Sequence, residues 1–165
     1  MLYILLALSV FSVAADQITK ALIYGHDSDF IKGFIRFASV ENRGAAWGFL
    51  NDTKGGMLVL TVLTAVVTAG LIFLLIKHRD MMPKQVAIPL ALVIGGAIGN
   101  LIDRVFIGYV RDFICTEFIS FPVFNFADIC VTVGGIALAA AVLFTRKGRE
   151  YVNRLFPDDK NKVKK

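Results

Sequence analysis

The chain has 165 residues, of which 56% are hydrophobic and only 19% are charged. A soluble domain averages roughly 45–50% apolar and about 25% charged residues, and the apolar excess here is concentrated in four long uncharged stretches. This composition excludes a cytosolic globular enzyme, a disordered protein and a disulfide scaffold. It predicts a small polytopic membrane protein, because a transmembrane helix needs about 20 mostly apolar residues.

The net charge of +5 comes entirely from the end of the chain. Residues 146–165 carry eight Lys or Arg against three Asp or Glu, whereas residues 1–145 carry ten of each sign. A basic segment that directly follows a membrane span is typical of the cytoplasmic side of a membrane, where it can also contact anionic lipid head groups. Membrane lipids, and not a nucleic acid, are therefore the expected partners of this segment.

The first apolar stretch, residues 1–15, resembles the core of a signal peptide, but no Lys or Arg precedes it. Because the apolar pattern continues to Ile23, we expect an uncleaved first span at about residues 2–24. Uncharged runs predict further spans at about 55–76, 85–104 and 126–145. We expect residues 1–165 to form a single membrane domain that ends in a basic cytoplasmic tail, residues 146–165.

The segment between the first two spans, residues 25–54, is rich in Phe, Ile and Val, and Gly25 and Gly33 interrupt it. Such residues favour extended structure, so one or two short strands are predicted here, with their apolar side chains against the membrane surface. The predicted fold class is an α-helical polytopic membrane protein with four transmembrane helices and a small extracytoplasmic β-element between the first two.

The short loops predict the orientation of the four spans. Residues 77–84 and 146–165 are both basic and lie on the same side, so both should be cytoplasmic. Both chain termini are then cytoplasmic, and the loops at about 25–54 and 105–122 face outward.

Several polar residues lie within or beside the predicted spans, where a charge at mid-bilayer costs roughly 2.5–3.5 kcal/mol. Asp16 and Lys20 are four residues apart on one helical face, which is consistent either with a simple ion pair or with a polar site. Asn100, Asp103 and Arg104 close the third span on one face. An Asp103–Arg104 pair is the simple alternative there, and a site that faces the bundle is favoured.

The turn from Asn42 to Gly48 contains small residues, and its Trp47 suits the membrane interface. An ordinary interfacial turn is the favoured interpretation, although the Asn42 amide can both donate to and accept from an extended peptide.

Two further aspartates, Asp112 and Asp128, lie beside the third and fourth spans, near the outer face of the membrane. Singly, Asp112 is explained as a solvated loop charge beside Arg111, and Asp128 as an acidic residue at a helix N-terminus. Together they place two carboxylates at one membrane depth.

The sequence lacks the residues that zinc-dependent and serine-dependent hydrolysis require. The two histidines, His26 and His78, fall on opposite sides of the membrane, so no zinc site is expected. The chain has no GxSxG or P-loop motif, and Cys115 and Cys130 are expected to be free thiols. Two adjacent carboxylates can share one proton, so that one activates water while the other polarises a peptide carbonyl. An aspartic dyad without metal or cofactor is thus the favoured catalytic option.

Five motifs in order resemble those of bacterial lipoprotein signal peptidases, also called signal peptidase II. They are Asp16–Lys20 (DQITK), Asn42–Trp47 (NRGAAW), Gly99–Arg104 (GNLIDR), Val110–Phe113 (VRDF) and Phe124–Asp128 (FNFAD). The resemblance covers about residues 5–145. Two residues depart from the usual pattern: Arg111 stands where a small apolar residue is commoner, and Trp47 stands where Phe is commoner. A close cation would lower the pKa of Asp112, so Arg111 leaves the electrostatics of this carboxylate open.

The resemblance implies an intramembrane aspartic endopeptidase of the bacterial inner membrane that removes signal peptides from prolipoproteins. It implies cleavage just before a diacylglyceryl-modified cysteine, and inhibition by globomycin, a cyclic peptide that resembles the substrate. It also implies four transmembrane helices with a β-cradle and a mobile outer segment, both supplied mostly by residues 25–54. The implied catalytic residues are Asp112 and Asp128, with support from Asp16, Lys20, Asn42, Gly44, Asn100, Asp103, Arg104, Asn125 and Ala127.

Two other functions remain as alternatives on the residues alone. In a small transporter or channel the buried charges would line a polar path, and in a non-catalytic scaffold they would only lock the helices together. A path would place ionisable groups at several depths, whereas the acidic groups here cluster toward the outer ends of the spans, with Asp16 as the exception.

Overall fold

The computed structural model describes residues 1–44 and 55–156. The expectations for Trp47 and for the rest of residues 45–54 lie outside this part of the chain. Four helices are long and apolar enough to cross a membrane: α1 (Leu2–Ile23), α2 (Gly56–Lys77), α3 (Lys84–Phe106) and α4 (Phe126–Phe144). The prediction of four transmembrane helices is confirmed.

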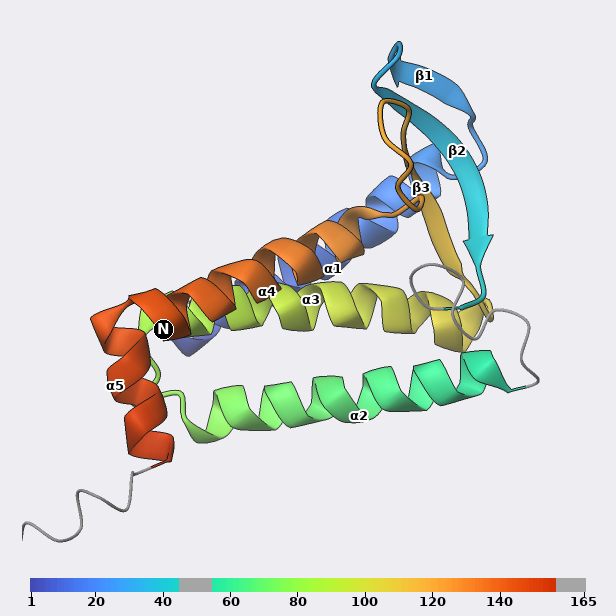
Figure 1. The fold of residues 1–165 in the computed structure, drawn as a ribbon. Coiled ribbons are helices and arrows are strands. Elements are labelled where there is room, and N and C mark those ends of the chain that lie inside the picture. The colour runs from blue at the N-terminus through green and yellow to red at the C-terminus, as the bar shows by residue number, and fades with distance from the viewer. Residues whose placement is uncertain (45–54, 157–165) are drawn as a thin grey trace, which may run out of the picture.

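Helix α3 lies at the centre of the bundle, with α1 and α4 beside it and α2 along another side (Figure 1). In its most apolar stretch 56% of the residues are buried, against 11% in α2. Exposed Val, Leu and Phe side chains cover the outer faces of α1, α2 and α4. Apolar surface of this extent is expected where helices face lipid instead of water.

Small residues let α1 approach α3 closely. A Cβ atom added to Gly99 would lie 2.6 Å from an Asp16 carboxylate oxygen, and one added to Gly95 would lie 2.7 Å from the Cβ of Ser12. The Ser9 hydroxyl donates to the Ala91 carbonyl at 2.9 Å. Close packing at small residues and hydrogen bonds between helices are the usual means by which helices associate in a membrane.

Three strands form an antiparallel sheet in the order β1 (Ser28–Ile31), β2 (Ile35–Asn42) and β3 (Val110–Thr116). The hairpin between β1 and β2 turns at Gly33, whose φ of 77° is a left-handed conformation that glycine adopts without strain. The predicted β-element is therefore present, but it has a third strand that was not predicted. Residues 110–116 were expected to be loop, because Arg111 and Asp112 interrupt the apolar pattern and the strand is completed only by pairing with β2.

The end of the chain contains a further helix, α5 (Arg146–Leu155), where only a basic tail was expected. The Thr145 hydroxyl caps it by accepting from the Gly148 N–H at 3.0 Å, and Tyr151 is buried in the apolar core. Figure 1 shows α5 crossing one end of the bundle, while the sheet extends from the opposite end. The molecule therefore has two chemically different ends, of which the sheet end carries the polar residues described next.

Candidate active site

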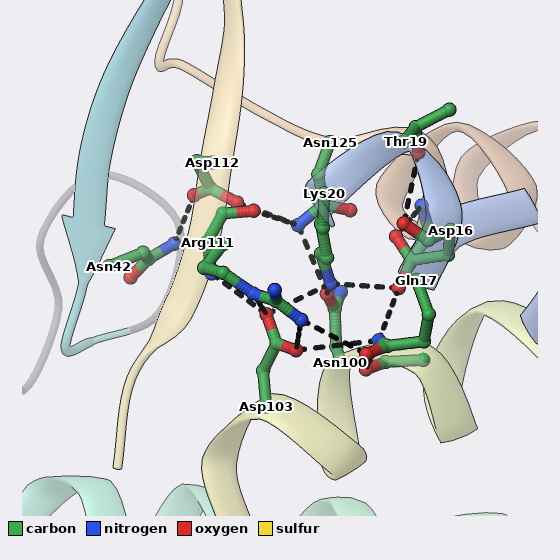
Figure 2. Close-up of polar contacts among 12 residues, drawn as sticks. Asp16, Gln17, Thr19, Lys20, Asn42, Asn100, Asp103, Arg111, Asp112 and Asn125 are labelled. Atoms are coloured by element: carbon green, nitrogen blue, oxygen red, sulfur yellow. Dashed lines mark hydrogen bonds and ion pairs between the residues drawn. The ribbon is translucent and has the colours of Figure 1, made fainter. Parts of the chain in front are cut away.

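Strand β3 brings Asp112 into a buried position beside β2. Asp112 is only 1% exposed. It is therefore not the solvated loop charge that the sequence suggested when this residue was considered singly. The Asn42 amide donates to one Asp112 oxygen at 2.9 Å, and the Asn125 amide donates to the other at 2.6 Å. Both carboxylate oxygens are thus held by amides from different elements (Figure 2).

Asp128 lies in the first turn of α4 and takes part in a capping box. Its backbone N–H donates to the Asn125 side chain at 3.0 Å, and its carboxylate accepts from the Asn125 N–H at 3.1 Å. This reciprocal arrangement is a standard helix start, as the simple interpretation expected. The other carboxylate oxygen, however, accepts from the Asn100 amide at 2.8 Å, so Asp128 is also part of a polar site.

A pair of asparagines links the two carboxylates. The Asn125 amide nitrogen donates to the Asn100 side-chain oxygen at 3.0 Å and also donates to Asp112, while Asn100 donates to Asp128. Asp112 and Asp128 are therefore connected through the side-chain amides of Asn125 and Asn100.

Burial, followed by the negative charge of Asp128, raises the pKa of Asp112 to about 7, against the lowering effect of the Asn42 and Asn125 hydrogen bonds. The sequence left open how Arg111 affects this pKa. The Arg111 guanidinium pairs with Asp103 and not with Asp112. Near neutral pH, Asp112 can therefore hold a proton that an ordinary aspartate would have lost.

A buried ion cluster centred on Lys20 lies next to the asparagine pair. Its ammonium lies 2.8 Å from an Asp16 oxygen and 3.2 Å from an Asp103 oxygen, and it donates to Asn100 at 3.0 Å. The simple Asp16–Lys20 pair therefore exists, but it belongs to the polar site. The suggested Asp103–Arg104 pair is wrong, because Asp103 pairs with Lys20 and Arg111.

The remaining predicted residues lie at the edges of this network. The Ala127 N–H donates to Asp16 at 3.0 Å, which ties the start of α4 to α1. The Gly44 N–H donates to the Asn42 side chain at 3.1 Å and so orients its amide toward Asp112. Arg104 lies within electrostatic range of Asp128 and Asp112, and its buried Nε has no hydrogen-bond partner within residues 1–44 and 55–156.

All eleven predicted residues lie at the sheet end of the bundle. Two further residues, Gln17 and Arg111, join them there although they were not predicted as site residues. The Gln17 amide donates to Asp16, to the Gly99 carbonyl and to Asp103 at 3.0–3.3 Å, and its oxygen accepts from Arg111. Arg111 was considered only for its effect on the pKa of Asp112. Both residues lie inside the quoted motifs, which is the signal that could have identified them.

The described residues contain no group of three His, Cys, Asp or Glu side chains that could hold a metal ion. Cys115 and Cys130 are free thiols. The chemistry that the described groups support is general acid–base catalysis by paired carboxyl groups.

Comparison with known proteins gives a consistent result. The family model for signal peptidase (SPase) II matches residues 8–144. A lipoprotein signal peptidase of Clostridium novyi (strain NT) is 38% identical over 148 residues, which span 85% of this chain and 96% of that protein. One of Enterococcus faecalis is 36% identical over 154 residues, spanning 89% and 92%.

The fold has a counterpart among solved structures. A bacterial membrane enzyme determined by the in meso method at 1.9 Å resolution superposes with a TM-score of 0.74 and 33% identity, covering 87% of this chain and 95% of that one. With the family match extending over most of the chain, these similarities identify the protein as a member of the signal peptidase II family of aspartic endopeptidases.

Proposed function

We propose that Asp112 and Asp128 are the catalytic pair with which this endopeptidase removes signal peptides from prolipoproteins. The observation that carries the proposal is the bridge through Asn125 and Asn100, which joins two carboxylates from separate elements. Neither a transporter path nor a scaffold requires that arrangement. The negative charge of Asp128 also raises the pKa of Asp112, as expected of two carboxyl groups near enough to share one proton.

In the proposed mechanism the two carboxyl groups have different tasks. Asp112, with its pKa of about 7, holds the proton and donates a hydrogen bond to the scissile carbonyl. Asp128 takes a proton from water while the water oxygen bonds to the carbonyl carbon. That proton then passes to the leaving nitrogen as the C–N bond breaks, which releases the signal peptide with a new carboxyl group.

The supporting residues divide by what they contact. Asn42 and Asn125 hold Asp112, and Gly44 orients Asn42. Asn100 holds Asp128, while Asp16, Lys20, Asp103 and Ala127 fix the ends of α1, α3 and α4 beneath the pair. Arg104 supplies a positive charge to the environment of the two carboxylates.

We further propose that the substrate carries a diacylglyceryl-modified cysteine directly after the scissile bond. The names of the relatives, lipoprotein signal peptidases, support a lipoprotein substrate. The exposed apolar faces of the helices support access from the lipid phase. Globomycin-type cyclic peptides would then occupy the same site as the substrate.

The proposed location is the bacterial inner membrane, with both termini cytoplasmic, the active site near the extracytoplasmic face and residues 1–165 as one membrane domain. Basic residues in the 77–84 loop and in α5 support this orientation. The sheet and the polar site lie at the opposite end of the bundle from α5 (Figure 1).

The catalytic proposal is tested with Asp112→Asn, Asp128→Asn and the double variant, assayed for cleavage of a diacylglyceryl-modified prolipoprotein. Each single change should abolish turnover, and the double variant should be hardly worse than either, because the two groups act as a unit. Asp29→Asn, at an exposed carboxylate of β1, is the matched control and should remain active. Near-full activity of a folded Asp112→Asn enzyme would favour the scaffold or transporter function.

The substrate proposal is tested by comparing the lipidated prolipoprotein with its unlipidated form. Burial of acyl chains contributes about 0.8 kcal/mol per CH₂, so the lipidated form should be strongly preferred. Equal turnover of both forms would remove lipid recognition from the mechanism. Globomycin should compete with the lipidated substrate.

A further inference from the structure

We infer that Arg111 is a positioning residue for Asp112, which it holds in place through Asp103 and Gln17; this inference rests on the proposed catalytic role of Asp112. Neighbouring residues of a strand point to opposite faces. The side chain of Arg111 therefore extends away from that of Asp112, toward Asp103 of α3 and Gln17 of α1 (Figure 2).

The Arg111 side chain makes a fork-like contact with one carboxylate. Its Nε donates to one Asp103 oxygen at 3.2 Å and its terminal nitrogen donates to the other at 2.8 Å. The same terminal nitrogen donates to the Gln17 side-chain oxygen at 3.0 Å. Bidentate pairs of this kind fix orientation as well as distance, and lysine cannot reproduce their planar geometry.

The backbone of Arg111 is held from both sides. Its N–H donates to Asp103 at 2.9 Å, and its carbonyl accepts from the Asn125 amide at 3.4 Å. The two peptide groups that flank Arg111 are thus held, the preceding one by α3 and the one that leads into Asp112 by the start of α4. Displacement of this peptide would move the Asp112 carboxylate relative to Asp128.

Arg111 also balances the charge of the buried cluster. Asp16 and Asp103 share the single ammonium of Lys20, so the guanidinium supplies the second positive charge. Without it the cluster would carry a net negative charge close to Asp112 and would oppose ionisation of the dyad. The activity profile should then move to higher pH.

The charged or titratable groups around Arg111 and Asp112 are Asp16, Lys20, Tyr24, Glu41, Asp103, Arg104, Tyr109 and Asp128.

The test compares Arg111→Val, which keeps a good strand former, with Arg111→Lys, which keeps the charge. Arg36→Val is the matched control, because Arg36 lies on β2 of the same sheet in a half-exposed pair with Glu117. Steady-state kinetics on the lipidated substrate are measured from pH 5 to pH 9, and rates are divided by the folded fraction from size-exclusion chromatography.

Arg111→Val should lower kcat roughly 10²-fold with little change in KM, because a displacement of about 1 Å has that effect on catalysis. Its acid limb should move up by on the order of one pH unit. Arg111→Lys should keep the parental pH profile with an intermediate kcat, and Arg36→Val should behave as the parent enzyme.

Two results would overturn the inference. One is a parental kcat per folded molecule in Arg111→Val, and the other is an identical pH profile in Arg111→Val and the parent. Activity of Asp112→Asn, measured in parallel, separates the two proposals. If that variant is inactive while Arg111→Val resembles the parent, only the role of Arg111 is wrong; if it is active, the dyad itself is wrong.

Discussion

Asn125 is the residue on which the geometry of the site most depends. Its amide nitrogen donates to Asp112 and Asn100, its side-chain oxygen accepts from the Asp128 N–H, and its own N–H donates to the Asp128 carboxylate. The residue is fully buried. A single side chain therefore both starts α4 and sets the spacing of the two carboxylates.

Asn125→Ala should reduce turnover roughly 10²-fold, because loss of the bridge lets the carboxylates shift relative to each other. Loss of the helix cap should also lower the free energy of unfolding by about 0.5–2 kcal/mol. Cleavage assays and thermal unfolding in detergent measure the two effects. Asn153→Ala, at an exposed position of α5, is the control that should change neither. A fully active Asn125→Ala enzyme would contradict the bridging role.

Asp112 should make folding depend on pH in a specific direction. Its pKa is about 7 when folded, against 3.8 for an ordinary aspartate, so the folded protein retains a proton that the unfolded chain has lost. The stability due to this proton is fully present below about pH 4 and is lost as the pH rises through about 7. The parent should therefore lose stability relative to Asp112→Asn as the pH rises from about 4 to about 7.

This difference should amount to a few kcal/mol at pH 8. Unfolding temperatures of the parent and of Asp112→Asn, taken at several pH values in one detergent, measure it. Parallel curves for the two proteins would show that Asp112 ionises normally in the folded state. Asp29→Asn again serves as the exposed control.

At the scale of the elements, α3 determines where the charged residues of α1 can lie. Its glycines allow α1 to approach closely enough for Asp16 to lie against Gly99 and for Lys20 to reach Asn100 and Asp103. A larger residue at the point of closest approach would separate the two helices. The packing of two apolar helices thus decides the arrangement of the ionic groups at their ends.

Gly99→Ala should destabilise the protein by roughly 1–3 kcal/mol, the usual cost of overpacking, and lower its activity. The added methyl group would lie 2.6 Å from an Asp16 oxygen, whereas a Cβ atom at Gly135 would meet nothing within 4 Å. Gly135→Ala is therefore a matched control within another transmembrane helix. Thermal unfolding and cleavage assays on both variants test the prediction, which fails if the two behave alike.

Strand β3 shows how one element can serve two parts of the molecule. Along one face it directs Asp112 toward Asn42, and on the other it directs Arg111 toward Asp103. Its pairing with β2 carries Asn42 to the end of the bundle, since Val40 lies opposite Asp112 and Asn42 opposite Val110. The sheet is thus part of the proposed active site and not only a cover above it.

At the scale of the whole molecule, the polar and apolar interiors are separated along the bundle. The apolar cluster includes Leu75, Val86 and Tyr151, the last of which belongs to α5. The buried Asp103 and Asp112 belong to the end of α3 and to β3, at the sheet end of the bundle (Figure 1). The proposed reaction is thereby confined to one end, where the proposed topology places the extracytoplasmic surface.

The topology predicts which positions a membrane-impermeant thiol reagent can reach. In a Cys115→Ser, Cys130→Ala background, Asp29→Cys and Ser120→Cys should react in intact cells, because both residues are exposed at the sheet end. Asn153→Cys on α5 should react only after the membrane is permeabilised. Labelling of Asn153→Cys in intact cells, without labelling of the other two, would reverse the orientation.

The sequence by itself determined the class of protein and its membrane helices, because the hydropathy of about 20 successive residues is a local property. The ordered motifs likewise identified the family and the residues that gather at the sheet end. These properties need no knowledge of which segments lie side by side.

Only the tertiary structure decided how those residues are connected. The partners of Arg111, the third strand and the asparagine bridge all depend on contacts between distant parts of the chain. Arg111 and Gln17, for example, are 94 positions apart. Local sequence presents Arg111 as the neighbour of Asp112, yet the alternation of a strand turns its charge toward Asp103. Burial, which raises the pKa of Asp112, likewise arises only when the sheet closes over the ends of the helices.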